Sequence, residues 1–295
     1  MKRAARAGEI ERYLRTGDHD PLFAAWPGNH LLEKASAGSA DLSSALVAEA
    51  ERRARGRTIP ESVPAIDLVA LARRKVEPMV RGLFPRSEQE AVIGLLERSI
   101  VFLTPDRIAS ILRGRSFPHS AWMLANLYLV SLGAEPLSAD APRIVGMSEE
   151  TTCFVSVEYF DAAEQGPFED FVVHEAAHVF HSCKRRTIAL RESPRRGEWL
   201  LDIAFRKREM FAYACEAYSR ILERATRPAD RRALAKEAAG NDPPDDSVDP
   251  EEYASILRAA TAARTRLGGF RAILDRCAER WSPRTGRNAS TPTSD

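Results

Sequence analysis

The chain has 295 residues, of which 44% are hydrophobic and 29% charged, with a formal net charge of +1. These values are ordinary for a soluble globular protein. Because basic and acidic residues balance, they argue against a general binder of nucleic acid or of acidic membranes. The length is sufficient for one large hydrophobic core or two smaller ones.

Neither a membrane span nor a secretory signal is expected. The longest apolar run, at 121–134, is too short for a membrane helix and contains Asn126 and Ser131. The first twenty residues are basic but lack an apolar stretch. The four cysteines form no close pair of the zinc-ribbon kind. We therefore expect free, buried thiols and a cytoplasmic protein.

Residues 1–140 are predicted to form a helical N-terminal region. Asp41 can cap a helix that ends at Gly56. Ser87 and Glu90 have the spacing of a capping box at the start of a later helix. Prolines separate these elements and are typical of the connections between helices.

The segment 141–226 changes character and is predicted to hold a small sheet followed by two helices. The runs at 142–147 and 151–160 are rich in β-branched and aromatic residues. The second contains "CFVSVEYF", whose apolar residues partly alternate, and this favours a strand pair or hairpin. The two helices are expected at about 167–184 and 198–225, with a basic loop between them.

The C-terminal part is predicted to be less ordered. Residues 227–250 contain "AAGNDPPDDSVDP" and are interpreted as a linker. One or two helices are expected within 251–281, followed by a disordered tail at 282–295. The whole chain is therefore predicted to be α+β and mostly α-helical, with a small sheet or hairpin packed on the helix pair.

The stretch "FVVHEAAHVFHSC" carries the main functional prediction. His174 and His178 are four residues apart, so a helix places them on one face, where both imidazoles can bind one Zn²⁺. Glu175 lies beside the first histidine, where it can act as general base toward a zinc-bound water. With six histidines in the chain, a chance match has a probability of roughly one in a hundred, so the motif is informative.

The segment 142–225 combines this HExxH motif with a candidate strand before it and the sequence "KREMFAYACEAYSRIL" after it. It resembles the zincin metallopeptidases. The resemblance implies a strand whose edge holds the substrate in extended form, and "CFVSVEYF" at 153–160 is the candidate. The metzincin subclass needs glycine and histidine three and six residues after His178. His181 and Lys184 occupy these positions, so the closer resemblance is to the gluzincins, whose third zinc ligand is a downstream glutamate.

The resemblance implies that this glutamate lies on the second predicted helix. Glu209, which begins the sequence Glu-Met-Phe-Ala and so resembles the E-x-F-A element of several gluzincins, is preferred over Glu216, seven residues later on the same stripe. The acid that does not bind the metal can orient a histidine or pair with a neighbouring arginine. Tyr213 is a candidate for stabilising an oxyanion, with Tyr218 and Tyr159 as further choices. For each of them, a core aromatic residue is the ordinary alternative.

The third histidine of the stretch, His181, is not expected to bind the same ion. It lies about 10 Å along the helix axis from His174, at 1.5 Å per residue. We expect His181 to lie at the rim of the site, to contact a residue that binds the metal, or to be hydrogen-bonded in the core. Cys183 follows closely, but thiolate ligation there needs the chain to turn back.

The sequence therefore predicts a zinc-dependent metallopeptidase with Zn²⁺ as cofactor and a peptide or protein as substrate. One alternative is a zinc-binding structural or regulatory protein without hydrolytic activity. A second is a DNA-linked N-terminal region, because 105–129 loosely follows a helix-turn-helix pattern, although its second helix is mostly apolar. A third is a metal-free interaction scaffold. The pattern assigns no particular substrate and no oligomeric state.

Overall fold

The computed structural model describes residues 2–59, 66–141, 144–160, 166–192, 197–240 and 245–278. Within these ranges the fold is mostly α-helical with one three-stranded mixed sheet, which confirms the predicted α+β class. The helices are α1 (Lys2–Thr16), α2 (Leu31–Ala54), α3 (Leu68–Leu83), α4 (Arg86–Ser99), α5 (Ile108–Arg113), α6 (Pro118–Ser131), α7 (Phe171–Ser182), α8 (Arg208–Arg224), α9 (Pro228–Ala238), α10 (Pro250–Ala262) and α11 (Gly268–Cys277). The strands are β1 (Ile100–Phe102), β2 (Gly146–Glu149) and β3 (Thr152–Val155).

The sheet has the strand order β1-β3-β2. A hairpin is present as β2 and β3, which pair antiparallel, but β2 lies at Gly146–Glu149 and overlaps only the end of the predicted run 142–147, whose first two residues lie outside the described residues. β1 pairs parallel with β3. β1 is not predicted by the sequence, because its three residues continue the apolar pattern of α4. Among the described residues β3 is therefore the central strand, and the prediction that 153–160 offers an edge to the substrate is wrong. β2 is an edge strand, and residues 157–160 form a 3-10 turn.

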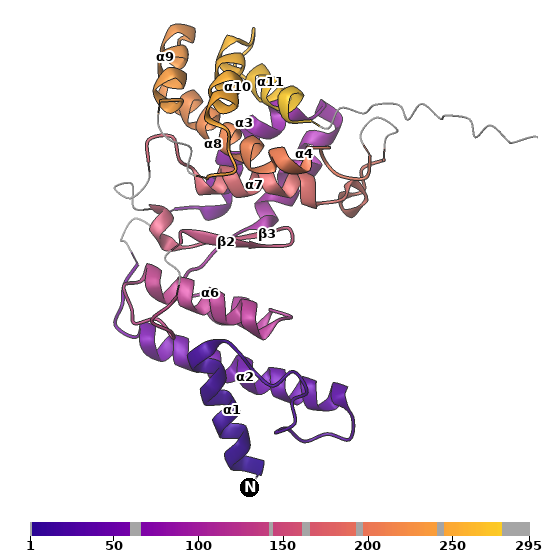
Figure 1. Ribbon diagram of the computed structural model, residues 1–295, viewed down its shortest axis with the longest axis vertical. Coiled ribbons are helices and arrows are strands. Elements are labelled where there is room, and N and C mark those ends of the chain that lie inside the picture. The colour runs from indigo at the N-terminus through magenta and orange to yellow at the C-terminus, as the bar shows by residue number, and fades with distance from the viewer. Residues whose placement is uncertain are drawn as a thin grey trace, which may run out of the picture.

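The sheet separates two hydrophobic cores, because successive side chains of a strand point to opposite faces. Cys153 and Val155 of β3 belong to a C-terminal core formed with α3, α4 and α7 to α11, whereas Phe154 belongs to an N-terminal core formed with α1, α2, α5 and α6. Figure 1 shows the consequence: an elongated molecule with the N-terminal helices at one end and the sheet between the two groups of helices.

These cores divide the chain differently from the predicted regions. α3 and α4 lie within the predicted N-terminal region 1–140 but pack in the C-terminal core. The predicted linker 227–250 contains α9, whose first residue, Pro228, has a backbone suited to a helix start and whose inner face is buried. The helices predicted within 251–281 are present as α10 and α11. The predicted disordered tail 282–295 lies outside the described residues.

Two predicted helix starts are wrong because tertiary contacts use the residues differently. Asp41 lies inside α2, where its carboxylate accepts a hydrogen bond from Trp26 Nε1 at 2.6 Å, and the helix begins eleven residues earlier, after His30. Ser87 and Glu90 do not form a capping box, since α4 begins at Arg86 and has no side-chain cap.

α6 is buried in the N-terminal core, as its apolar sequence predicts. Its buried Asn126 donates to the carbonyl of Trp122 and accepts a hydrogen bond from the amide of Leu137 at 2.8 Å, so the helix also holds the following loop. In the part of the chain that the structure describes, no helix has the length and apolar composition of a membrane span.

Candidate metal site

The helix that carries the histidines, α7, begins at Phe171 rather than near Pro167. The Asp170 side chain caps it by accepting a hydrogen bond from the amide of Val173. Its apolar side chains are buried on the side that faces the C-terminal core: Val172, Val173, Ala176, Ala177, Val179 and Phe180. This burial turns His174 and His178 toward α8.

The second helix, α8, is shorter than predicted. It begins at Arg208, after a 3-10 turn at Phe205–Lys207, instead of near residue 198. Glu209 therefore lies in its first turn, at the end of α8 that faces the histidines. α8 packs beside α7 through buried residues that include Ala212, so the small side chains let the two helices approach.

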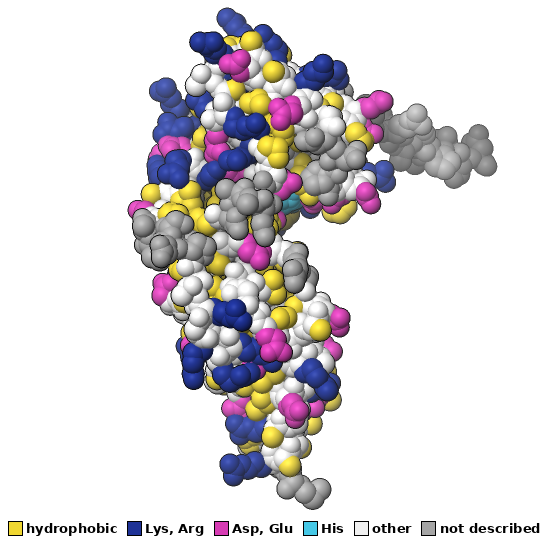
Figure 2. Space-filling view, turned by 90° about the vertical axis from the view of Figure 1, so that its left-hand side faces the viewer, with side chains coloured by type: hydrophobic (Ala, Val, Ile, Leu, Met, Phe, Trp, Pro, Cys, Tyr) yellow, Lys and Arg dark blue, Asp and Glu magenta, His cyan; other side chains and the backbone are white. Residues whose placement is uncertain are grey.

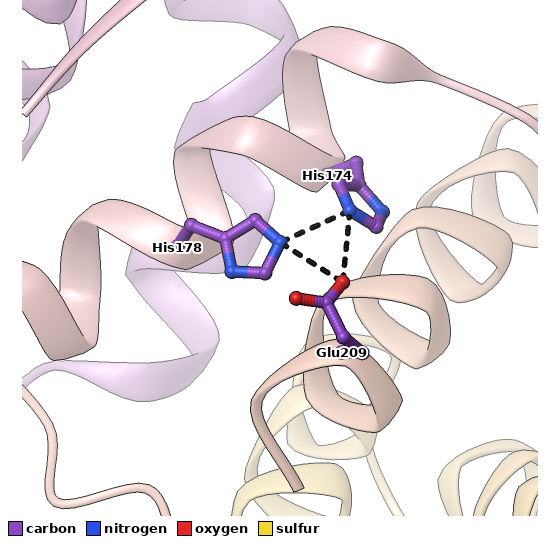
Figure 3. A group of neighbouring side chains, drawn as sticks. All are labelled: His174, His178 and Glu209. Carbon is purple, nitrogen blue, oxygen red and sulfur yellow. Dashed lines mark hydrogen bonds and ion pairs between the residues drawn. The ribbon is translucent and has the colours of Figure 1, made fainter. Parts of the chain in front are cut away.

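The two histidines and Glu209 bring three donor atoms together (Figure 3). The Nε2 atoms of His174 and His178 are 3.0 Å apart. Oε2 of Glu209 is 3.7 Å from the first and 3.4 Å from the second. Tetrahedral zinc with bonds of about 2.0–2.1 Å holds its ligand atoms about 3.3–3.4 Å apart. The donor triangle therefore has the size that one zinc ion requires.

One side of this triangle faces solvent. The side chain of Glu209 is 42% exposed, while both histidines are more deeply placed. Figure 2 shows that the surface is hollowed at the level of the sheet, with a histidine side chain visible at the hollow. Among the described residues the group contains three such donors, not four. A metal held here would keep one coordination position for an external ligand, as catalytic zinc sites do.

The cluster is electrostatically prepared for a cation. Burial alone would lower the pKa of His174, but hydrogen bonds with Glu209 and Glu216 outweigh it and raise this pKa to about 9. Hydrogen bonds with His174 and His178 in turn lower the pKa of Glu209 below its usual range. The carboxylates thus stabilise positive charge between them, carried either by a proton on His174 or by a metal ion.

Glu216, the alternative ligand, lies on the far side of His174. Its Oε2 is 3.1 Å from Nδ1 of His174, and its Oε1 accepts a hydrogen bond from the amide of Asp170. Asp170 is itself held by Lys75, at 2.7 Å, and by the hydroxyl of Tyr159, at 3.1 Å. Burial raises the pKa of Glu216, and this effect outweighs the hydrogen bond with His174, which lowers it. This buried network orients the imidazole so that Nε2 points at the cluster.

Glu175 is not part of the donor triangle. Its carboxylate accepts a hydrogen bond from Oγ of Ser148 on the edge strand β2. Ser148 pairs in register with Cys153, so its side chain faces the α7 side of the sheet. Ser148 is not predicted from the sequence, because nothing in the local pattern shows that β2 lies beside α7. The position of Gly146 helps to bring them together, since the ring of Phe171 occupies the space where a Cβ would lie.

Tyr213 lies against His174 rather than away from the site. Its ring centroid is 4.3 Å from that of His174, with the two ring planes at 60°. Burial, together with nearby carboxylates, raises the pKa of Tyr213 to about 12, so its hydroxyl stays protonated at neutral pH and can donate a hydrogen bond. Its predicted role at an oxyanion stays a prediction.

His181 does not join the triangle but contacts a member of it. Its Nε2 is 2.9 Å from Nδ1 of His178. Burial, with the nearby His178 and Arg208, lowers the pKa of His181 to about 4, so the ring is neutral at physiological pH. Cys183 is also outside the cluster, with its thiol directed to the carbonyl of Lys184.

Zinc binding is expected to depend on pH because the ion has to displace a proton. With a pKa of about 9, His174 is protonated at neutral pH. The apparent zinc affinity should therefore rise about tenfold per pH unit between roughly pH 7 and 9, and level off above this range. Competition with a chromophoric chelator at several pH values, corrected for the protonation of the chelator, measures the slope. An affinity that does not change over this range would contradict the assignment.

The chain matches no protein-family model, no curated protein and no solved structure. What can be said of its site therefore follows from the residues and their geometry.

Proposed function

We propose that this protein is a zinc-dependent metallopeptidase whose metal is held by His174, His178 and Glu209. The observation that carries the proposal is the donor triangle of zinc size, open to solvent on one side, with the carboxylate of Glu175 on the next residue of the same helix. Two imidazoles and one carboxylate with a free position are the donor set of many hydrolytic zinc sites.

Each residue then has a defined task. Bound zinc supplies Lewis-acid chemistry, in that it polarises a carbonyl group and lowers the pKa of water. Glu175 takes the proton of the attacking water and passes it to the leaving amine. Ser148 holds the carboxylate of Glu175 by its hydroxyl. Tyr213 is the candidate donor to the oxygen on which negative charge develops.

The place for a peptide is the outer edge of β2. In the described residues β2 pairs with β3 on one side, so its other edge can pair with an extended chain. Ser148 on this strand contacts Glu175, so a peptide aligned along β2 would pass beside the general base.

A purely structural zinc site, which would only link α7 to α8, is less well supported. Structural zinc sites are closed by four protein ligands, whereas three donors converge here among the described residues. The two helices are also joined by packed apolar side chains, including Ala176, Phe180 and Phe211. Their association therefore has a source other than a metal ion.

The test is metal analysis of protein purified without a histidine tag. We expect about one zinc per chain, and none in a His174→Ala variant, because this ligand is buried and held by Glu216. Labelled casein should be cleaved by the parent, and the cleavage should stop with a zinc chelator and return with added zinc. A His119→Ala variant, altered at an exposed position of α6 away from the site, is the control and should retain its zinc. Protein that contains no zinc and cannot be reconstituted would overturn the proposal.

A further inference from the structure

His174 and His178 have different hydrogen-bond partners on Nδ1, the ring nitrogen that faces away from the cluster. Nδ1 of His174 contacts the carboxylate of Glu216, a common arrangement around metals. Nδ1 of His178 contacts another histidine, with Nε2 of His181 at 2.9 Å and the two rings nearly perpendicular at 80°. His181 is only 9% exposed, so its side chain is fixed in the core beside the ligand.

The chemistry of the ligand decides where the protons lie in this pair. His178 can bind a metal through Nε2 only if that atom carries a lone pair, so the proton of its neutral ring must be on Nδ1. That N–H then donates to Nε2 of His181, which must be unprotonated. His181 in turn carries its proton on Nδ1.

The opposite arrangement is incompatible with metal binding. If His181 donated from Nε2 to Nδ1 of His178, the neutral ring of His178 would carry its proton on Nε2, the atom that faces His174 and Glu209. Nδ1 of His181 is buried and has no hydrogen-bond partner among the described side chains.

We propose that His181 is a positioning residue that sets the tautomer and ring orientation of His178 for metal binding. Its neutral ring provides an acceptor without adding a negative charge next to the carboxylates of Glu209 and Glu216. The inference rests on the metal site of the proposed function but not on hydrolysis, so zinc affinity tests it directly.

Two similar substitutions separate this role from a merely structural one. In His181→Gln, the amide oxygen can reach the position of Nε2 and accept the hydrogen bond from His178. In His181→Asn, the shorter side chain reaches only the position of Nδ1. His181→Phe fills the space without any acceptor, and His119→Phe is the matched control outside the site.

The measurement is zinc affinity by chelator competition, on variants whose folding is checked by circular dichroism in the metal-free state. Loss of a partner of a ligand histidine typically weakens metal binding by about 10–100-fold, and we expect this for the Asn and Phe variants. The Gln variant should stay within about threefold of the parent, because its amide oxygen replaces the acceptor. The control should be unchanged. Cobalt-substituted protein should show an altered visible spectrum with Asn or Phe and the parent spectrum with Gln.

The outcomes distinguish the inference from the proposed function. Equal zinc affinity in the parent and the Phe variant, or equal losses in the Gln and Asn variants, would overturn the role of His181 while leaving the metallopeptidase proposal standing. Zinc binding by the parent without any cleavage of casein would overturn the peptidase and leave the comparison of variants valid. A parent that binds no zinc overturns both.

Discussion

Replacement of Glu175 by glutamine is expected to abolish hydrolysis and to leave the zinc content unchanged. The amide has the shape of the carboxylate and can still accept a hydrogen bond from Ser148, but it cannot take a proton from water. General-base catalysis typically contributes about 10²–10⁴-fold, so casein cleavage should fall at least about a hundredfold. The measurement pairs the rate of cleavage with metal analysis of the same sample.

A matched control is available on the same segment. Glu169→Gln removes the same charge from an exposed side chain just before α7, where the carboxylate accepts a hydrogen bond from the amide of Gly166. This variant should retain both zinc and activity. A Glu175→Gln protein as active as the parent would show that another group moves the proton.

Substitutions of the two glutamates of α8 are expected to weaken zinc binding to different extents. Glu209→Gln should weaken zinc binding by more than about a hundredfold, because it removes a charged ligand. Glu216→Gln should weaken it by about 10–100-fold, the range for a group that orients a ligand histidine. Chelator competition gives both values. Since Glu209 is partly exposed and Glu216 is buried, only the second variant should also lose thermal stability without metal.

The order of these two effects decides the assignment of the third ligand. If Glu216→Gln loses zinc and Glu209→Gln retains it, Glu216 is the ligand and the donor triangle has been assigned to the wrong carboxylate. A Glu237→Gln variant on the exposed face of α9 serves as control for the loss of one acidic charge.

What the sequence determined by itself is local. A spacing of four residues places His174 and His178 on one helix face in any α-helix, with Glu175 beside them. Alternation of apolar residues indicated the β2–β3 hairpin, and the length and apolar character of 121–134 indicated the buried helix α6. Helix geometry also kept His181 out of the donor triangle, as its distance along the axis predicted.

The tertiary structure decided everything that joins distant segments. Helix periodicity puts both Glu209 and Glu216 on the stripe of α8 that faces α7. The point where the two helices cross, and the start of α8 at Arg208, bring Glu209 to the Nε2 atoms and Glu216 to Nδ1 of His174. β3 is central because β1, which pairs Ile100 with Cys153 from a distant part of the chain, lies on its other side. The contact of Ser148 with Glu175 likewise depends on packing between β2 and α7, which no local pattern encodes.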